Sequence, residues 1–360
     1  MLMQLTDLFE VRSRKSVGNR PVSSLAFDWL YTGLLLLFTV GFMMDVWSHS
    51  TFGPDQSVLS EYHLLFYTSG ALMGALLVGS HFRNVGAGYR FEDALPQGYG
   101  FALLALLGFG VAGAADLVGH ALWGFEVDNE ALLSPSHLGL FVTWGGLASG
   151  TVMATLARVR RQGKQSLLRM LPAIIGLVAM LLPFSVMMLI SSLPMGDFMI
   201  VQEARIEINH WLLESHALVG FYVQTALLFG FLLWFVRNMP MPIGAITLIF
   251  ALYGFIFGLV SGDSVLLGTV ASLSGFATEL VYHAVRPHGS RRINFRLFGF
   301  LAPIAFWLAY FGYIMVTNFG GGIGMTEYMW LGVTFHTGLI GFAMATFMTL
   351  QPAPVLALEE

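Results

Sequence analysis

Long apolar segments recur along the whole chain and restrict its fold more than any other feature. Each has roughly 20 residues, the length that an α-helix needs to cross the hydrocarbon core of a bilayer. Only 11% of the residues are charged, against about 25% in soluble domains. The sequence therefore predicts an all-α, polytopic transmembrane helix bundle of about ten spans. The predicted spans are 26–48, 58–82, 98–120, 133–157, 170–193, 209–236, 241–261, 264–285, 296–317 and 326–350.

Basic residues alternate between the connections. Of the 17 Lys and Arg residues, all except Arg205 lie before the first span or in alternate connections, whereas the remaining connections carry acids. The positive-inside rule makes the basic side cytoplasmic. We therefore expect a multi-pass protein of the cell (plasma or inner) membrane with both termini cytoplasmic. The expected parts are a cytoplasmic segment 1–25, a single transmembrane domain 26–350 and a cytoplasmic tail 351–360.

This topology arranges the spans as five helical hairpins whose tips face outward. Two tips resemble each other: "MMDVWSHSTFGPDQSVLSEYHLLFY" and "AADLVGHALWGFEVDNEALLSPSHLGL". Both read D-x-x-x-H at the end of the outgoing helix and S-x-x-H at the head of the returning helix. This similarity suggests duplication of a hairpin. The expected hairpins are 26–82, 98–157, 170–236, 241–285 and 296–350.

The repeated Asp and His residues form the sharpest candidate site. Residues four apart lie on one face of a helix, so each Asp projects together with the first His of its hairpin. The antiparallel returning helix brings the second His to the same depth. Charge inside a bilayer is costly unless it is paired or ligated, and imidazole with carboxylate suits zinc, copper, iron or nickel. The expected metal ligands, in one shared site or in two, are Asp45, His49, His63, Asp116, His120 and His137.

A plainer interpretation competes with the metal site, because Asp and His at the ends of spans also pair with each other and with interfacial water. The chain has no Cys, which excludes thiolate sites and iron–sulfur clusters. Other polar residues near the tips are candidates for additional ligands or for groups that orient the ligands. These are Glu126, His210, Glu214, His216 and His336.

On the inner side, Glu279 and His283 lie four residues apart and are candidates for a proton entry from the cytoplasm. Snorkelling to the interface beside Arg286 is the alternative. The segments "GALMG" and "GGLASG" have small residues four apart, which predicts close approach of helix backbones.

The D-x-x-x-H followed by a histidine on the next helix resembles the metal-binding hairpin of the C subunit of particulate methane and ammonia monooxygenases. The resemblance covers the two hairpin tips. It implies that Asp45, His49 and His63, and likewise Asp116, His120 and His137, bind copper within the membrane. The portion "GFEVDNEALLSPSHLGL" also resembles part of a prokaryotic polytopic membrane family, which implies no activity.

Three classes of function remain open. The first is a copper-binding membrane protein, with zinc or iron as alternative metals, that serves as an oxidoreductase, a monooxygenase subunit or a subunit of a redox complex. The second is a haem-b electron carrier with His63, His137, His216 or His336 as axial ligands. The third is a transporter of metal ions or a small solute, since transporters are commonly built from repeats. The expected partners are the lipid bilayer and other membrane or redox subunits, and no nucleic acid.

Overall fold

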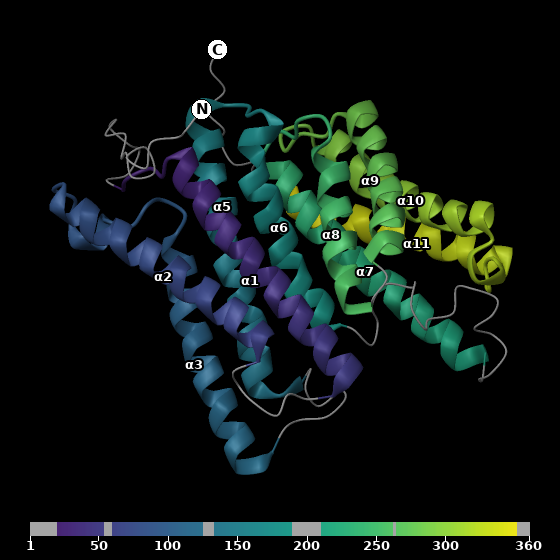
Figure 1. Ribbon diagram of the computed structural model, residues 1–360. Helices are drawn as coiled ribbons and strands as arrows, with labels where there is room; N and C mark the ends of the chain where they lie inside the picture. Colours follow the sequence, from purple (N-terminus) through teal and green to yellow (C-terminus); the bar gives the residue numbers. More distant parts are fainter. Residues whose placement is uncertain (1–19, 54–59, 125–132, 189–209, 262–263, 351–360) are drawn as a thin grey trace. The chain divides into compact units, whose positions relative to one another are not determined.

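The computed structural model describes residues 20–53, 60–124, 133–188, 210–261 and 264–350 (Figure 1). These residues contain ten α-helices and no β-strand, which confirms the predicted polytopic helix bundle. The helices are α1 (Leu25–Phe52), α2 (Glu61–Gly86), α3 (Gly100–Trp123), α5 (Pro135–Gln162), α6 (Leu167–Met187), α7 (His210–Asn238), α8 (Ala245–Ser261), α9 (Ser264–Val285), α10 (Arg292–Thr317) and α11 (Glu327–Met348).

Nine of these helices are long and apolar enough to cross a membrane by length and composition. The tenth, α8, is shorter and begins four residues later than the predicted span at 241. Pro240 and Pro242 explain the late start, since a proline disfavours helical backbone in the residue before it. A multi-pass membrane protein in contact with lipid follows from the nine long helices.

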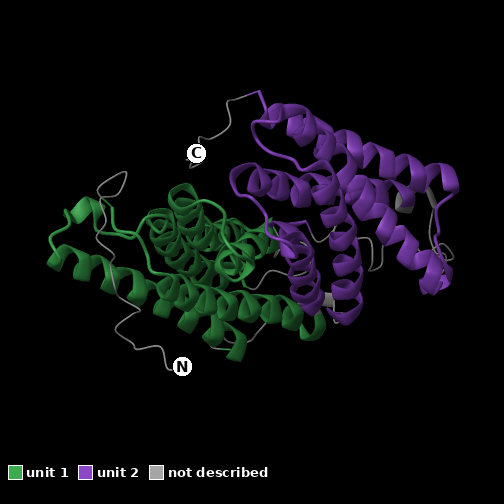
Figure 2. Ribbon diagram, turned by 90° about the horizontal axis from the view of Figure 1, so that it is seen from above, with its two compact units in different colours: residues 1–183 green, residues 184–360 purple. Residues whose placement is uncertain are grey.

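The chain divides into two compact units, residues 1–183 and residues 184–360, with the boundary inside α6 (Figure 2). Each unit is described by itself. The single transmembrane domain expected over 26–350 stays a prediction.

In the first unit, two helical hairpins pack together. They are α1 with α2 and α3 with α5, as the sequence predicts. Each returning helix begins at a serine N-cap: the Oγ of Ser60 accepts the backbone N–H of His63, and the Oγ of Ser134 accepts that of His137, both at 3.3 Å. Such a cap satisfies one of the otherwise unpaired N–H groups of the first turn.

Each outgoing helix of these hairpins ends at a glycine in the same unusual conformation. Gly53 has φ 86° and ψ 178°, and Gly124 has φ 86° and ψ −177°. Their N–H groups donate to the carbonyls of His49 and His120, at 3.1 and 3.0 Å. Only glycine adopts this region without strain. The repeated motif is thus D-x3-H-x3-G followed by S-x2-H.

Aromatic rings fill the core of the first unit. Phe42 stacks on Trp144 with ring centroids 4.7 Å apart, and Phe38 packs edge-on against Phe109 at 5.1 Å. The Trp144 indole N–H donates to Thr39 Oγ1 at 3.3 Å, which satisfies the buried donor. The ligand candidates on these helices lie about one to three helical turns from these rings, so an apolar core lies beneath the candidate site.

The segment "GGLASG" brings α5 close to α3, as predicted. A Cβ added at Gly146 on α5 would lie 2.6 Å from Ala105 Cβ on α3. A larger side chain at Gly146 would therefore force the two helices apart. In "GALMG" on α2, a Cβ at Gly74 would meet only the flexible end of Leu106, so close approach of backbones there stays a prediction.

A buried ion pair joins α1 to α5 at the end of the hairpins away from the tips. The Arg158 guanidinium contacts Asp28 Oδ2, and the two side chains are 7% and 0% exposed. The Tyr99 hydroxyl donates to Asp28 Oδ1 at 2.7 Å. Tyr99 is the residue directly before α3. This cluster links α1 and α5 to the residue that precedes α3.

In the second unit, α8 packs on α9, α9 on α10, α10 on α11, and α11 on α7. Trp307 is fully buried and donates from its indole N–H to Thr225 Oγ1 at 2.8 Å. The backbones of α10 and α11 approach closely, since a Cβ at Gly341 would overlap the carbonyl oxygen of Gly299. The fourth and fifth predicted hairpins are therefore present.

Candidate metal centre

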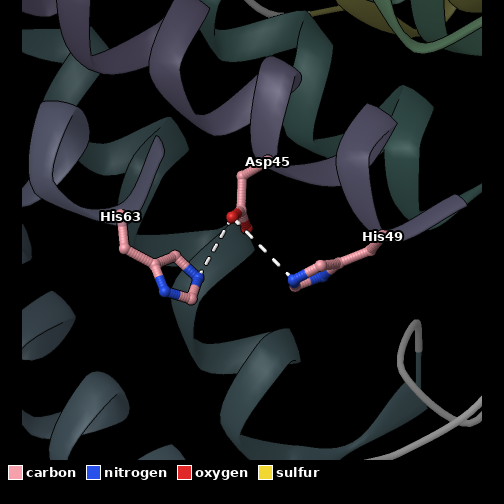
Figure 3. A group of neighbouring side chains, drawn as sticks. All are labelled: Asp45, His49 and His63. Atoms are coloured by element: carbon pink, nitrogen blue, oxygen red, sulfur yellow. Dashed lines mark ion pairs between the residues drawn. The ribbon is translucent and has the colours of Figure 1, made fainter. Parts of the chain in front are cut away.

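The first group of converging side chains consists of Asp45, His49 and His63 and is called the first group below (Figure 3). Asp45 Oδ1 lies 3.1 Å from His63 Nε2 and 3.9 Å from His49 Nε2. The Asp45 carboxylate is 9% exposed and the His63 ring 14%, whereas the His49 ring is 36% exposed. The His49 ring is therefore the most exposed of the three side chains, although its Nε2, which faces Asp45, is buried.

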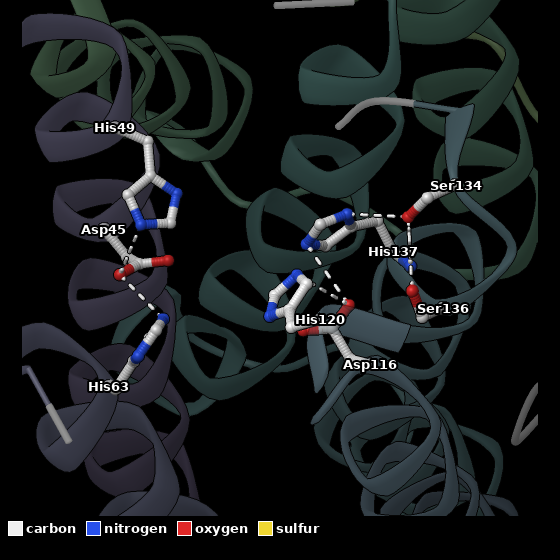
Figure 4. A network of polar contacts seen from close by, with 8 residues as sticks. All are labelled: Asp45, His49, His63, Asp116, His120, Ser134, Ser136 and His137. Carbon is white, nitrogen blue, oxygen red and sulfur yellow. Dashed lines mark hydrogen bonds and ion pairs between the residues drawn. The ribbon is translucent and has the colours of Figure 1, made fainter. Parts of the chain in front are cut away.

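The second group consists of Asp116, His120 and His137 and has the same construction (Figure 4). Asp116 Oδ1 lies 3.7 Å from His120 Nε2 and 3.6 Å from His137 Nε2. Its three side chains are between 12% and 20% exposed. This group is the more evenly enclosed of the two.

Helix geometry positions both groups in the same way. The Asp and the first His occupy successive turns at the C-terminal end of α1 or α3, and the second His stands at the third position of α2 or α5. The glycine C-cap fixes the end of the outgoing helix, and the serine N-cap fixes the start of the returning helix. Since the hairpins are antiparallel, these two ends meet.

Ser134 contacts the ring of His137 as well as its backbone. Its Oγ lies 2.8 Å from His137 Nδ1 and 3.2 Å from Ser136 Oγ. In the tautomer that presents Nε2 to a ligand, Nδ1 carries the proton and donates it to Ser134. Histidines that bind metals usually have their second ring nitrogen held in this way.

The two groups are neighbours within the first unit. Tyr67 on α2 lies close enough to both Asp45 and Asp116 to interact with both carboxylates electrostatically, and its ring packs against His63 with centroids 5.8 Å apart. Phe66 packs against His63 at 5.3 Å, and Phe141 packs against His137 at 6.4 Å. The groups thus stand separately, one on each hairpin, and share an aromatic surrounding.

Each group can accommodate a transition metal with little rearrangement. One ligand atom from each of its three residues lies within 4.8 Å of the others. Metal–ligand bonds of about 2.0–2.2 Å to His and Asp place ligand atoms roughly 3–4 Å apart. Three protein ligands also leave a coordination position for water or substrate, as catalytic sites require. Within the described residues no other set of three such side chains converges.

The additional candidates have varied placements. Glu126 lies outside the described residues, and so does the side chain of His210. Glu214 is half-buried and His216 is exposed, both on α7. His336 on α11 is exposed, and its Nδ1 lies 2.8 Å from the Tyr222 hydroxyl on α7. Their roles as further ligands stay predictions.

On the other side of the predicted bundle, Glu279 serves as a helix cap. Its Oε1 accepts the backbone N–H of Gly244, and its Oε2 accepts the N–H and hydroxyl of Thr247 at 2.9 and 2.5 Å. His283 Nε2 lies 3.4 Å from Glu279 Oε1 and its side chain is 42% exposed. Proton entry at this pair stays a prediction, while the hydrogen bonds give the carboxylate a structural role at the start of α8.

Sequence reasoning misses three contributors to the site. The caps have a readable signal, because a serine three residues before a histidine and a glycine four residues after one recur in both hairpins. Tyr67 has no such signal, since its nearness to both carboxylates depends on how the hairpins pack. The Ser134–His137 ring contact depends on a side-chain rotamer, which the spacing does not determine.

Comparisons with protein-family models, with curated proteins and with solved structures found no match.

Proposed function

We propose that this chain is an integral membrane protein that binds one transition-metal ion at each of its two Asp–His–His groups, on the extracytoplasmic face. One observation carries the proposal: two hairpins independently bring a carboxylate and two imidazoles within 4.8 Å of one another. Arg20 lies before the start of α1 and Arg160 lies near the end of α5, whereas the ligands lie at the other ends of these helices. The positive-inside rule then gives the outward orientation.

Copper is the metal that we propose first, on the strength of the resemblance to the copper-binding hairpin. Two imidazoles and one carboxylate also suit zinc and non-haem iron. With a redox-active metal and an open coordination position, the chain would act as a membrane oxidoreductase or as a subunit of a redox complex.

The contacts of the returning histidines favour a metal ion over haem. His63 and His137 each direct Nε2 toward a carboxylate, at 3.1 and 3.6 Å. An axial haem ligand needs that nitrogen to face an open slot for the macrocycle. A carboxylate in that position suits a metal ion, since it neutralises part of the positive charge.

Metal content tests the proposal. The protein is purified in mild detergent without chelator, and its metals are quantified by mass spectrometry. We expect one ion for each of the two groups. Asp116→Ala with His120→Ala, and separately Asp45→Ala with His49→Ala, should each remove one of the two ions. The element that is found identifies the metal.

His283→Ala is the matched control, because it removes a histidine from an acid–histidine pair that no third ligand joins among the residues that the structure describes. We expect its metal content to equal that of the wild type. Negligible metal in the wild type and in folded variants alike would overturn the proposal. Size-exclusion chromatography and circular dichroism establish that the variants are folded.

A further inference from the structure

The second unit has a polar cluster of its own in its interior. It consists of Ser185 on α6, Gln224 on α7 and Tyr253 on α8 and is called the central cluster below. Ser185 and Gln224 are 0% exposed, and Tyr253 is 1% exposed. Ser185 Oγ lies 2.8 Å from the Tyr253 hydroxyl, and this hydroxyl lies 3.4 Å from Gln224 Oε1. Three helices thus bring uncharged polar side chains together inside an apolar bundle.

Two members of the central cluster stand at the middle of their helices. Gln224 is the fifteenth of the 29 residues of α7, and Tyr253 is the ninth of the 17 residues of α8. With a rise of 1.5 Å per residue, each side chain is about equally far from both ends of its helix. Phe229 on α7 and Phe250 on α8 are buried nearby in the chain and pack against each other with centroids 5.9 Å apart. In a membrane, the cluster therefore lies where an unpaired polar group is most costly.

The Gln224 side chain has one polar end without a partner. Its amide carries an oxygen, which accepts hydrogen bonds, and an NH₂ group, which donates them. The oxygen faces the Tyr253 hydroxyl, whereas Nε2 is buried and has no hydrogen-bond partner among the described residues. Turning the amide over exchanges the two atoms and leaves the oxygen without a partner instead. In both orientations one end of the amide, called the unpaired end below, has nothing to bond.

A buried amide end of this kind indicates a bound molecule. An unpaired polar group in an apolar interior carries the full cost of its lost hydration. Where side chains do not satisfy such groups, native proteins hold ordered water or a ligand against them. None of the three side chains of the central cluster carries a charge at neutral pH, so nothing there neutralises an ion. The chemistry of the cluster therefore suits a small uncharged molecule that forms hydrogen bonds.

We propose that the central cluster binds one such molecule, water or a molecule of similar size and polarity, through the unpaired end of Gln224. The inference is independent of the proposed metal function, because it concerns other helices and needs no metal. It gives the second unit a binding site at the middle of its helices, the depth at which membrane transporters commonly hold their solutes.

Thermal unfolding of the full-length protein in mild detergent tests whether the site is occupied. Gln224→Met keeps the length of the side chain and removes both ends of the amide. With a bound molecule, the substitution loses its hydrogen bond and should lower the midpoint of unfolding by about 2–4 °C. In an empty site, the substitution loses only the 3.4 Å contact with Tyr253 and removes the unpaired end. An unchanged or raised midpoint would therefore overturn the inference.

Leu228→Met is the matched control, since Leu228 is 1% exposed and lies one turn along the same helix. Exchange of leucine for methionine conserves volume, so its midpoint should stay close to that of the wild type. Equal losses for Gln224→Met and Leu228→Met would show that methionine itself disturbs the packing of α7, and the inference would fail.

Infrared spectroscopy distinguishes water from another small molecule. Protein films are hydrated with ordinary water or with oxygen-18 water, which shifts the stretching bands of water and leaves those of the protein in place. A shifted band that is present in the wild type and in Leu228→Met, and absent in Gln224→Met, identifies water. A lowered midpoint without such a band identifies a different small molecule at the same site.

The wild type alone provides the remaining test if Gln224→Met fails to fold. In a high-resolution crystal structure, an ordered molecule about 2.7–3.2 Å from the unpaired end of Gln224 supports the inference. An empty site, or a side chain that bonds to this end directly, overturns it.

Discussion

At the scale of single residues, Asp28 and Arg158 show what an ion pair in an apolar interior does for a membrane protein. The two side chains are 0% and 7% exposed, and Tyr99 donates a further hydrogen bond to the carboxylate. Burial removes the water that would stabilise the two charges, so each charge is stabilised mainly by the other. The pair holds α1 against α5, the two helices that carry Asp45 and His137 at their other ends.

Removing one member of this pair should be much more harmful than removing both. We expect Arg158→Met to destabilise the protein by about 3–5 kcal/mol, because Asp28 is left charged and unpaired. Arg158→Met together with Asp28→Leu should recover at least half of that loss. Equilibrium unfolding in mixed micelles measures both values.

Arg160→Met is the control, since Arg160 is exposed in the same turn region. Its effect should stay within about 0.5 kcal/mol. Asp28→Leu alone is measured as well. If the double variant of Asp28 and Arg158 loses as much stability as Arg158→Met and Asp28→Leu lose together when measured singly, the two charges act independently and this account is contradicted.

Some of these residue pairs can be predicted from the sequence and others cannot. Asp45 with His49, and Asp116 with His120, are predictable because a spacing of four places residues on one helix face. Asp28 and Arg158 lie far apart in the chain, and no spacing rule relates them. Only the packing of α1 against α5 brings them together.

At the scale of helices, the glycine C-caps of α1 and α3 set the position of the first histidine in each group. Gly124 donates its N–H to the carbonyl of His120 at 3.0 Å, which closes the last turn of α3. A Cβ at Gly124 would have nothing within 4 Å. Any effect of a substitution there therefore comes from the backbone conformation and not from crowding.

Gly124→Ala should destabilise the end of α3 by about 1–3 kcal/mol, because φ 86° with ψ −177° is strained for alanine. We expect the last turn to open and the second group to lose metal affinity, while the first group keeps its own. Copper titration of Asp45→Asn, which leaves the second group intact, and of Asp116→Asn, which leaves the first, each with and without Gly124→Ala, measures this difference.

Gly110→Ala provides the comparison within the same helix, since a Cβ at Gly110 also meets nothing within 4 Å. Alanine in a helix interior should stabilise by about 0.5–1 kcal/mol. If Gly124→Ala and Gly110→Ala change the free energy of unfolding in the same direction, the conformation of the cap is not what positions His120.

Helix bounds follow largely from the sequence, and their deviations have local causes. The predicted span at 296–317 is extended to Arg292 at its start, so Arg292 and Arg296 lie in the first turns of α10. A hydropathy pattern places arginines outside a span, whereas the hydrogen bonds of the helix continue beyond the apolar residues. The first and last residues of a helix depend on its capping residues, and a hydropathy pattern does not reveal these.

At the scale of the whole molecule, the number and order of helices are predictable, because each apolar segment is long enough to be recognised by itself. The division into two units at residue 183 is not predictable in this way. It falls inside α6, with no polar linker to mark it, and it depends on contacts between distant helices. The orientation across the membrane rests on charge distribution alone.

Cysteine labelling tests that orientation, and the absence of native Cys makes each introduced thiol the only target. We expect an impermeant maleimide to label Glu61→Cys and Glu327→Cys in intact spheroplasts. Gln162→Cys and Ser290→Cys, which lie in the basic connections, should react only after lysis. All four positions are exposed, so accessibility differs only by the side of the membrane. The reverse pattern would place the metal groups in the cytoplasm.

Each ligand group is encoded by one continuous stretch of chain, residues 45–63 or residues 116–137. Its carboxylate, its imidazoles and its two helix caps all travel together in that stretch. A stretch of this kind, transplanted into an unrelated antiparallel pair of membrane helices, would therefore bring its carboxylate and both imidazoles with it. Because the two stretches are separate in the chain, substitutions can remove the Asp and His residues of one hairpin and leave those of the other in place.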